Sequence, residues 1–272
     1  VGSISLKDVL FAKEEHIIEE IMEHDIHYVY THDDQEEAAK IISKYDITSI
    51  PVIDSTKTVL GIITVDDILD VVEEEATEDI HKMGAMTPLD GSYVESSTKS
   101  IIMSRMPWLL VLMISATFTG SIISSNQEIL VLLPSLAIFI PMLMDTAGNA
   151  GSQASAMVIR GLVVDDMGVK DFVKILIKET QVSFLLGIVL FIINTLRIGL
   201  FMPNVGWGIA IIVSLTIFIT ILLANLVGGA LPLLALVLKQ DPASMAAPLI
   251  TTLVDALSLM TYFLIASYFL RL

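Results

Sequence analysis

The chain has 272 residues, a formal net charge of −16 and a mean hydropathy of +0.76, and 54% of its residues are hydrophobic. This composition excludes an ordinary soluble protein and indicates several membrane spans. Residues 1–104 hold 23 of the 31 acidic residues but 7 of the 15 basic ones, so this third should repel nucleic acids and attract multivalent cations. The absence of cysteine excludes disulfides, thiolate metal sites and thiol catalysis.

Two stretches of the acidic third share one pattern. VGSISLKDVL (1–10) and LGIITVDDIL (60–69) each predict a short strand that ends in a hydroxyl residue, Ser5 or Thr64. That residue can cap a following helix whose first turn holds an aspartate, Asp8 or Asp67. An amphipathic helix over residues 35–44 and the strand ITSIPVID lie between them. A repeat of about this length indicates stacked supersecondary units.

The segment from THDDQEEAAK to VDDILDVV resembles one full CBS module, and residues 1 to about 22 resemble only the end of its partner module. Because Val1 is not an initiator methionine and no signal peptide precedes the acidic region, we expect the chain to be part of a longer protein. In CBS modules that bind adenine nucleotides, the Ser/Thr-x-x-Asp element commonly contacts ribose and phosphate. The resemblance therefore makes Thr64 and Asp67 candidates for binding ATP, while a helix cap with a first-turn acid explains the same residues.

The remaining sequence predicts five membrane-spanning helices joined by short polar stretches. The predicted spans are residues 107–125, 129–158, 172–197, 207–238 and 243–270. Basic residues near one side are Arg105, Arg160, Lys170, Lys174, Lys178 and Lys239, and those near the other are Arg197 and Arg271. This excess places the acidic third in the cytosol and, with five spans, the C-terminus outside the cell membrane.

Polar residues interrupt the apolar runs at three places. The second span carries Gly148, Asn149, Gly151 and Gln153, and the fourth carries LLANLVGGALPLL, so we expect both helices to be broken there, beside protein or a water-filled path. The last span carries Asp255, whose insertion into a membrane costs roughly 2.5–3.5 kcal/mol. Either a bound cation offsets this cost, or Asp255 is hydrogen-bonded within the helix bundle.

Three motifs in this order resemble the MgtE family of magnesium transporters and channels. They are EEEATEDIHKMGAM, the Gly-Asn-x-Gly-x-Gln cluster followed by MVIRGL, and DPASMAAPLITTLVDALSLMTYF. The resemblance implies an α-helical membrane protein of five spans with a cytosolic α/β CBS portion, working as a homodimer with a central pore. It divides the chain into a CBS portion (1–86), a connecting segment (87–106) whose helix, about 92–106, plugs the pore, and a pore domain (107–272).

The resemblance also assigns the ion sites. It makes Asp255 the pore residue that holds a largely hydrated Mg²⁺, with Asn149 and backbone carbonyls contacting its waters and Thr251 lining the pore. Two positions depart from the family pattern: Ala247 stands where Asn is frequent, and Asp145 where Gly is frequent. The implied regulatory Mg²⁺ ligands are Asp34, Glu36, Asp46, Asp67, Asp70, Glu75, Glu78, Asp79 and Asp241, although any one of these acids also fits a solvated surface.

Three functions remain open on the sequence. The first is a Mg²⁺ transporter or channel that closes when cytosolic Mg²⁺ bridges the acidic region. The second keeps the fold but couples transport to another ion or carries another divalent cation such as Co²⁺, and the third is a membrane-anchored, nucleotide-sensing CBS protein. An enzyme is not expected, because the sequence has no His-Glu-x-x-His, no Gly-x-Ser-x-Gly and no phosphate-binding loop.

Overall fold

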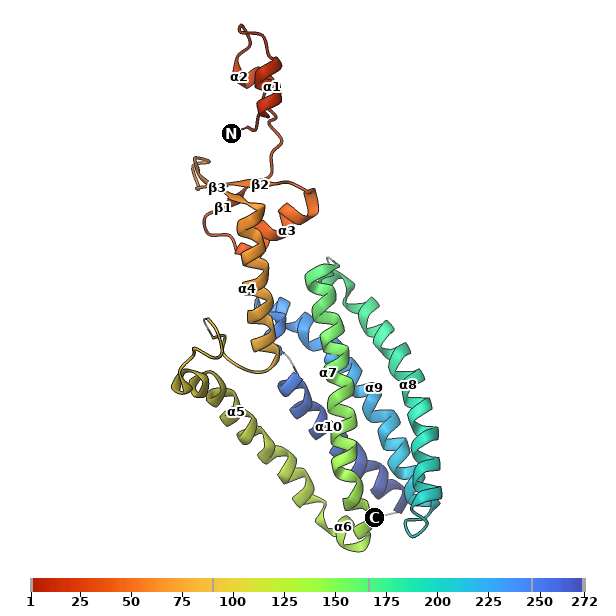
Figure 1. Ribbon diagram of the computed structural model, residues 1–272. Helices are drawn as coiled ribbons and strands as arrows, with labels where there is room; N and C mark the ends of the chain where they lie inside the picture. The colour runs from red at the N-terminus through yellow and green to blue at the C-terminus, as the bar shows by residue number, and fades with distance from the viewer. Residues whose placement is uncertain (1, 90, 166, 246, 271–272) are drawn as a thin grey trace. The chain divides into compact units, whose positions relative to one another are not determined.

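The computed structural model describes residues 2–89, 91–165, 167–245 and 247–270, and the chain divides into two compact units, Val1–Glu78 and Asp79–Leu272 (Figure 1). The division falls inside helix α4 (Val65–Met83) rather than at residue 86. The end of α4 belongs to the second unit because Lys82 forms an ion pair with Asp241 there, with 2.5 Å between Nζ and Oδ2.

The N-terminal unit is an α/β structure around a small sheet. Its elements are α1 (Leu6–Phe11), α2 (Ile18–Ile21), β1 (Val29–Tyr30), α3 (Gln35–Tyr45), β2 (Ser49–Ile53), β3 (Val59–Thr64) and most of α4. The strand order is β1-β2-β3, with β2 parallel to β1 and antiparallel to β3. A core of Val29, Ala38, Ile42, Ile50 and Ile68 joins α3 and α4 to the sheet.

The predicted hydroxyl cap is formed at Ser5 but not at Thr64. The Ser5 hydroxyl accepts a hydrogen bond from the N–H of Asp8 at 3.1 Å, as a helix cap should. At the start of α4 the acid reaches back instead: Asp67 Oδ2 accepts from the Thr64 N–H at 2.9 Å and from the Thr64 hydroxyl at 2.6 Å. The strand predicted before Ser5 is wrong, because residues 2–5 form one isolated bridge, Ser3 with Glu23, whereas β3 does lead into α4 at Thr64.

The second unit is a bundle of long helices. Its elements after α4 are α5 (Thr98–Ser125), α6 (Gln127–Leu132), η1 (Pro134–Phe139), α7 (Ile140–Val164), η2 (Val169–Asp171), α8 (Phe172–Phe201), α9 (Trp207–Val237), η3 (Pro242–Met245) and α10 (Ala247–Leu270). Helices α7 to α10 pack together, and α5 contacts the bundle chiefly along α10 (Figure 1). The largest core cluster includes Leu136, Leu143, Ile221 and Tyr262.

Four of the five predicted spans correspond to helical stretches long and apolar enough to cross a membrane: Thr98–Ser125, Val169–Phe201, Trp207–Val237 and Pro242–Leu270. The remaining predicted span, residues 129–158, is divided among α6, η1 and α7. Pro134 begins η1, since proline cannot donate the N–H that would continue the preceding helix. Helix α7 has the length to span, but its polar and small residues leave it outside that apolar set.

The predicted breaks in the second and fourth spans are wrong, because α7 and α9 run without interruption through both glycine-containing stretches. The glycines serve close packing instead. A Cβ placed on Gly228 of α9 would lie 2.1 Å from the carbonyl oxygen of Gly151 on α7. The absent side chains therefore allow the two backbones to touch, as small residues do between membrane helices.

The helix expected over residues 92–106 is not a separate element. It begins at Thr98, where the hydroxyl of Ser97 accepts from the N–H of Ser100, and continues through Pro107 to Ser125 as α5. Pro107 removes one backbone N–H from the helix. A membrane helix tolerates this loss because its other backbone groups remain hydrogen-bonded within the helix. The segment after α4 is joined to α5 by two hydrogen bonds: Thr87 N–H donates to Ser104 O at 3.0 Å, and the Ser104 hydroxyl donates to Thr87 O.

Candidate ion-binding site

Helices α7, α9 and α10 approach one another closely around the residues that the sequence predicts to form the ion site in the membrane. A Cβ on Gly148 would lie 3.0 Å from Thr251 Cγ2, and one on Gly151 would lie 2.9 Å from Ile250 Cγ2. Gly148 and Gly151 are therefore buried contacts between helices, and they hold α7 against α10. This contact sets the position of the polar side chains on the neighbouring faces.

Asp255 is half-buried on α10, one helical turn after Thr251 and two turns after Ala247. Within the described part of the chain, no side chain or backbone N–H donates a hydrogen bond to its carboxylate. The bundle-internal hydrogen bond that would make Asp255 a structural residue is thus not formed among these residues. The electrostatic influence that acts on Asp255 from the rest of the protein is the repulsive one of Asp145 on α7.

Asp145, Asn149 and Gln153 form a polar stripe on α7. They are four residues apart, so they lie on one face of the helix, and all three are exposed on the single chain. A stripe of two amides and a carboxylate is costly against lipid tails and is found where membrane helices face protein or water. Asp145, which the sequence marked as a departure, belongs to this stripe and is the closest of the three to the start of α7.

Carboxylate and amide oxygens are hard ligands that suit Mg²⁺, which keeps most of its waters and takes one or two carboxylates. Among the residues that the structure describes, no three His, Cys, Asp or Glu side chains come together as a metal site. The candidate oxygen ligands are the polar stripe on α7 and the Asp255 carboxylate on α10. Such a set is suited to a hydrated cation held from more than one side.

The expected regulatory acids of the N-terminal unit mostly make local contacts. Asp34 caps α3 by accepting from the Glu36 N–H at 3.1 Å, and Glu36 forms an ion pair with Lys40 at 3.0 Å. Asp67 accepts hydrogen bonds from Thr64, and the Thr64 hydroxyl holds the pKa of this carboxyl below its usual value. The Thr64 and Asp67 side chains, the candidates for nucleotide binding, thus satisfy each other at the start of α4.

The other expected regulatory acids lie along α4 and before α10. Glu75 accepts from the Gln35 amide at 2.5 Å. Asp241 accepts from the N–H of Ala243 at 2.8 Å in addition to its ion pair with Lys82. The remaining members are Asp46, which ends α3 with a left-handed φ of 52°, and Asp70, Glu78 and Asp79 on α4.

The sequence reasoning missed two polar contacts. One is the ion pair between Lys82 and Asp241, which joins positions 159 residues apart. The other joins Glu179 of α8 to Asn225 of α9, with 3.3 Å between Glu179 Oε2 and Asn225 Nδ2. Glu179 is an acid at the eighth position of a long apolar helix, and such a residue indicates a polar contact. No spacing rule, however, identifies its partner on another helix.

Comparison with known proteins identifies both parts of the chain. Residues 140–265 match the family model MgtE, described as a divalent cation transporter, and residues 18–74 match the CBS domain. The chain is 36% identical over 274 residues to the magnesium transporter MgtE of Thermus thermophilus and 35% identical over 273 residues to that of Bacillus subtilis. These alignments cover 99% and 100% of this chain but 59% of each relative, so the chain spans about three fifths of their length.

Two solved structures are similar over a smaller part. The soluble part of a magnesium transporter is 42% identical with a TM-score of 0.27, covering 28% of this chain and 30% of that one. The cytosolic domain of the Mg²⁺ channel MgtE in complex with ATP is 44% identical with a TM-score of 0.25, covering 26% and 28%.

The long apolar helices, the CBS module and the matched domain define a multi-pass membrane protein that carries a domain of the divalent cation transporter class. Within that class the resemblance predicted from the three motifs is confirmed by relatives along nearly the whole chain. Residues 140–265 of the chain therefore form an MgtE family domain.

Proposed function

We propose that this chain forms the conducting part of a Mg²⁺ transporter, in which two copies enclose a pore and Asp255 holds the hydrated ion. The observation that carries the proposal is the half-buried Asp255 carboxylate, which has no hydrogen-bond donor among the described residues and is repelled by Asp145. A divalent cation removes both the repulsion and the cost of keeping an acid in the membrane. The family relationship supports the choice of Mg²⁺ as the cation.

A homodimer follows from the same residues. The polar stripe of Asp145, Asn149 and Gln153 is exposed on one chain, and a second copy related by a twofold axis would enclose it in a water-filled path. Two Asp255 carboxylates facing across that axis would supply the one or two carboxylates that Mg²⁺ takes while keeping its waters. The amides of the stripe would then contact the waters of the ion.

We further propose that the acidic N-terminal unit lies in the cytosol of a cell membrane, with the C-terminus outside, and senses Mg²⁺. Because this unit carries most of the negative charge, its acids repel one another at low Mg²⁺, and bound Mg²⁺ favours a compact, closed form. The first turns of α5, in the region expected to plug the pore, would then close it. Asp241 would contribute from the loop before α10, where Lys82 now neutralises it.

The test is Mg²⁺ uptake into proteoliposomes by the purified chain and three variants. Asp255→Ala should abolish uptake, because the path then lacks the carboxylate that holds the hydrated ion. Asp145→Asn should retain uptake but alter the preference among Mg²⁺, Co²⁺ and other divalent cations. Glu128→Gln, an exposed acid on α6, is the matched control and should transport like the original chain. Undiminished uptake by Asp255→Ala would refute the proposal.

One observation favours coupled exchange or a different divalent cation: Asp145 adds a second acid to the site. A dependence of uptake on a Na⁺ or H⁺ gradient, lost in Asp145→Asn, would support this function. ATP binding at Thr64 and Asp67 is a separate proposal that rests on the CBS match, and it requires their mutual hydrogen bonds to open. Binding of ATP to the chain, measured by calorimetry and lost in Thr64→Val, would support it.

A further inference from the structure

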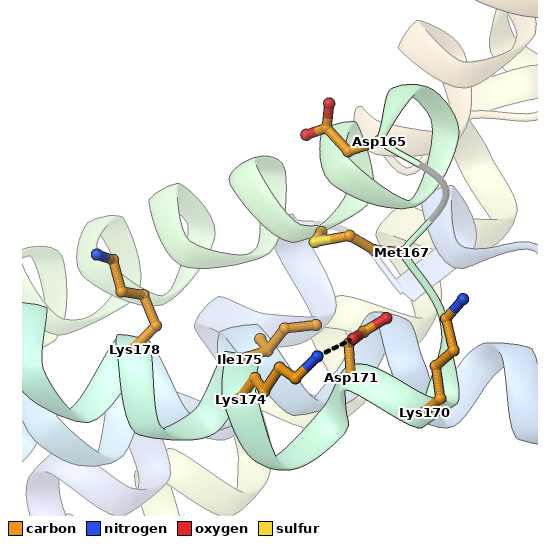
Figure 2. Close-up of a pocket in the computed structure, with 7 residues that line it drawn as sticks. All are labelled: Asp165, Met167, Lys170, Asp171, Lys174, Ile175 and Lys178. Carbon is orange, nitrogen blue, oxygen red and sulfur yellow. Dashed lines mark hydrogen bonds and ion pairs between the residues drawn. The ribbon is translucent and has the colours of Figure 1, made fainter.

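An open pocket of about 820 Å³ lies at the end of the bundle where α7 is followed by α8. Its lining residues are Asp165, Met167, Lys170, Asp171, Lys174, Ile175 and Lys178 (Figure 2). None of these residues was assigned to transport or to sensing Mg²⁺. Three lysines around one pocket, in a chain with a large negative charge, require an explanation of their own.

The pocket is held in place by the turn between the two helices. Met167 lies directly against Gly161 of α7, since a Cβ on that glycine would overlap the methionine methyl group. Asp171 accepts hydrogen bonds from the Gly168 N–H at 3.3 Å and from Lys174 Nζ at 3.1 Å, as Figure 2 shows for the lysine. One acid of the pocket is therefore already neutralised by one of its lysines.

The other two lysines form no ion pair with a residue that the structure describes. Among the described residues, no acidic side chain lies within ion-pair distance of Lys170 or Lys178, and both lysines are exposed. Lys174 and Lys178 lie one turn apart on one face of α8, and Lys170 lies in η2 just before that helix. Against Asp165 and Asp171, which line the same pocket, the three lysines leave these lining residues with a net positive charge that can attract an anion.

Apolar side chains flank the lysines. Val173 is 65% exposed and Ile177 is 54% exposed on the same turns of α8. Since α8 is one of the apolar helices able to cross a membrane, these side chains suit lipid tails, while lysines at a helix end reach toward the headgroups. A phospholipid combines a phosphate, which lysines can bind, with hydrocarbon tails, which Val173 and Ile177 can contact.

We infer that this pocket binds the phosphate of an anionic phospholipid through Lys170 and Lys178. Basic pockets between membrane helices are suited to lipid headgroups, and each lysine near an anionic surface strengthens binding by about fivefold. The inference rests on the membrane placement of α8 and not on transport of Mg²⁺, so it can fail while the proposed function holds, and the reverse.

The test is native mass spectrometry of the purified chain in detergent with phosphatidylglycerol or phosphatidylcholine added. The original chain should retain phosphatidylglycerol in preference to phosphatidylcholine. The double variant K170Q/K178Q should bind phosphatidylglycerol about 25-fold more weakly, and K170R/K178R should bind it like the original chain, because the charges remain. The control K99Q/K239Q removes two exposed lysines elsewhere and should leave binding unchanged.

Two results would overturn the inference. The first is equal retention of phosphatidylglycerol by the original chain and K170Q/K178Q at matched folding, as judged by circular dichroism. The second comes from inorganic phosphate added without lipid: lysine-dependent binding of phosphate as tight as that of phosphatidylglycerol would assign the pocket to a soluble phosphate compound. Weak or absent binding of phosphate is the result expected for a lipid site.

Discussion

Replacing Gly228 by alanine should weaken the packing of α9 against α7. The added Cβ would lie 2.1 Å from the carbonyl oxygen of Gly151 and 3.1 Å from the Cβ of Ala154. A normal carbon–oxygen contact of this kind is about 3.3 Å, so the two backbones must separate by about 1 Å. Overpacking of a tight core costs about 1–3 kcal/mol, and backbone atoms cannot rotate away as a flexible side chain could.

The matched control is Gly120→Ala. Apart from its chain neighbours and the adjacent backbone of α5, no described heavy atom lies within 4 Å of a Cβ placed on Gly120, so alanine there should stabilise the helix by about 0.5–1 kcal/mol through its better helix propensity. The two variants carry the same chemical change and should differ by about 2–4 kcal/mol in the free energy of unfolding. Denaturant unfolding of the purified protein in one detergent, followed by circular dichroism, measures this difference. If Gly228→Ala unfolds at the same denaturant concentration as Gly120→Ala, the close contact between α7 and α9 is not part of the fold.

Three further outcomes are expected. Tyr262→Phe should lower the free energy of unfolding by about 1–3 kcal/mol in the same assay, because its buried hydroxyl donates to a backbone carbonyl of η1 at 2.9 Å and that carbonyl would lose its partner. Hydrogen bonds from Thr64 lower the pKa of Asp67 in the folded state. Asp67 therefore stabilises the N-terminal unit fully above the unfolded pKa of about 3.9, and this stabilisation is lost as the pH falls through the folded pKa. Asp67→Asn should remove this part of the acid sensitivity, and an acid unfolding transition unchanged by the substitution would contradict the role of Asp67. Under the proposed function, Lys82→Gln should lower the cytosolic Mg²⁺ concentration that half-closes the pore by up to about fivefold, because Mg²⁺ would no longer compete with the lysine for Asp241 and a partly exposed ion pair contributes up to about 1 kcal/mol. Flux assays at graded internal Mg²⁺ would show this shift, and a rise would count against the role of Asp241.

The part of the N-terminal unit from residue 35 to residue 69 was well predicted because its signals are local. The helix over residues 35–44 is α3, and the strand that ends at Thr64 is β3 followed by α4. Hydroxyl residues, first-turn acids and alternating apolar residues act within a few positions of one another, so these patterns can be recognised from the sequence alone.

The membrane unit was predicted less completely, because a glycine in a membrane helix can either break the helix or let two helices pack closely. Gly151 and Gly228 suggested broken helices, and only their positions on two touching backbones show that they allow close packing. The same limit applies to Lys82 and Asp241, whose ion pair depends on how α4 ends beside the loop before α10. Local patterns fix the elements, but contacts between distant elements depend on the packing of the whole unit.

Helix α5 gives the molecule a mechanical element. It extends over 28 residues, about 42 Å, from Thr98 to Ser125, and the two hydrogen bonds between Thr87 and Ser104 couple its early turns to the segment that follows α4. An uninterrupted helix is stiff, so a displacement at Ser104 would be carried to its far end instead of being absorbed on the way. Pro107 lies inside α5, three residues after Ser104, and lacks the N–H that would hydrogen-bond to the preceding turn. The helix should therefore bend most easily near Pro107.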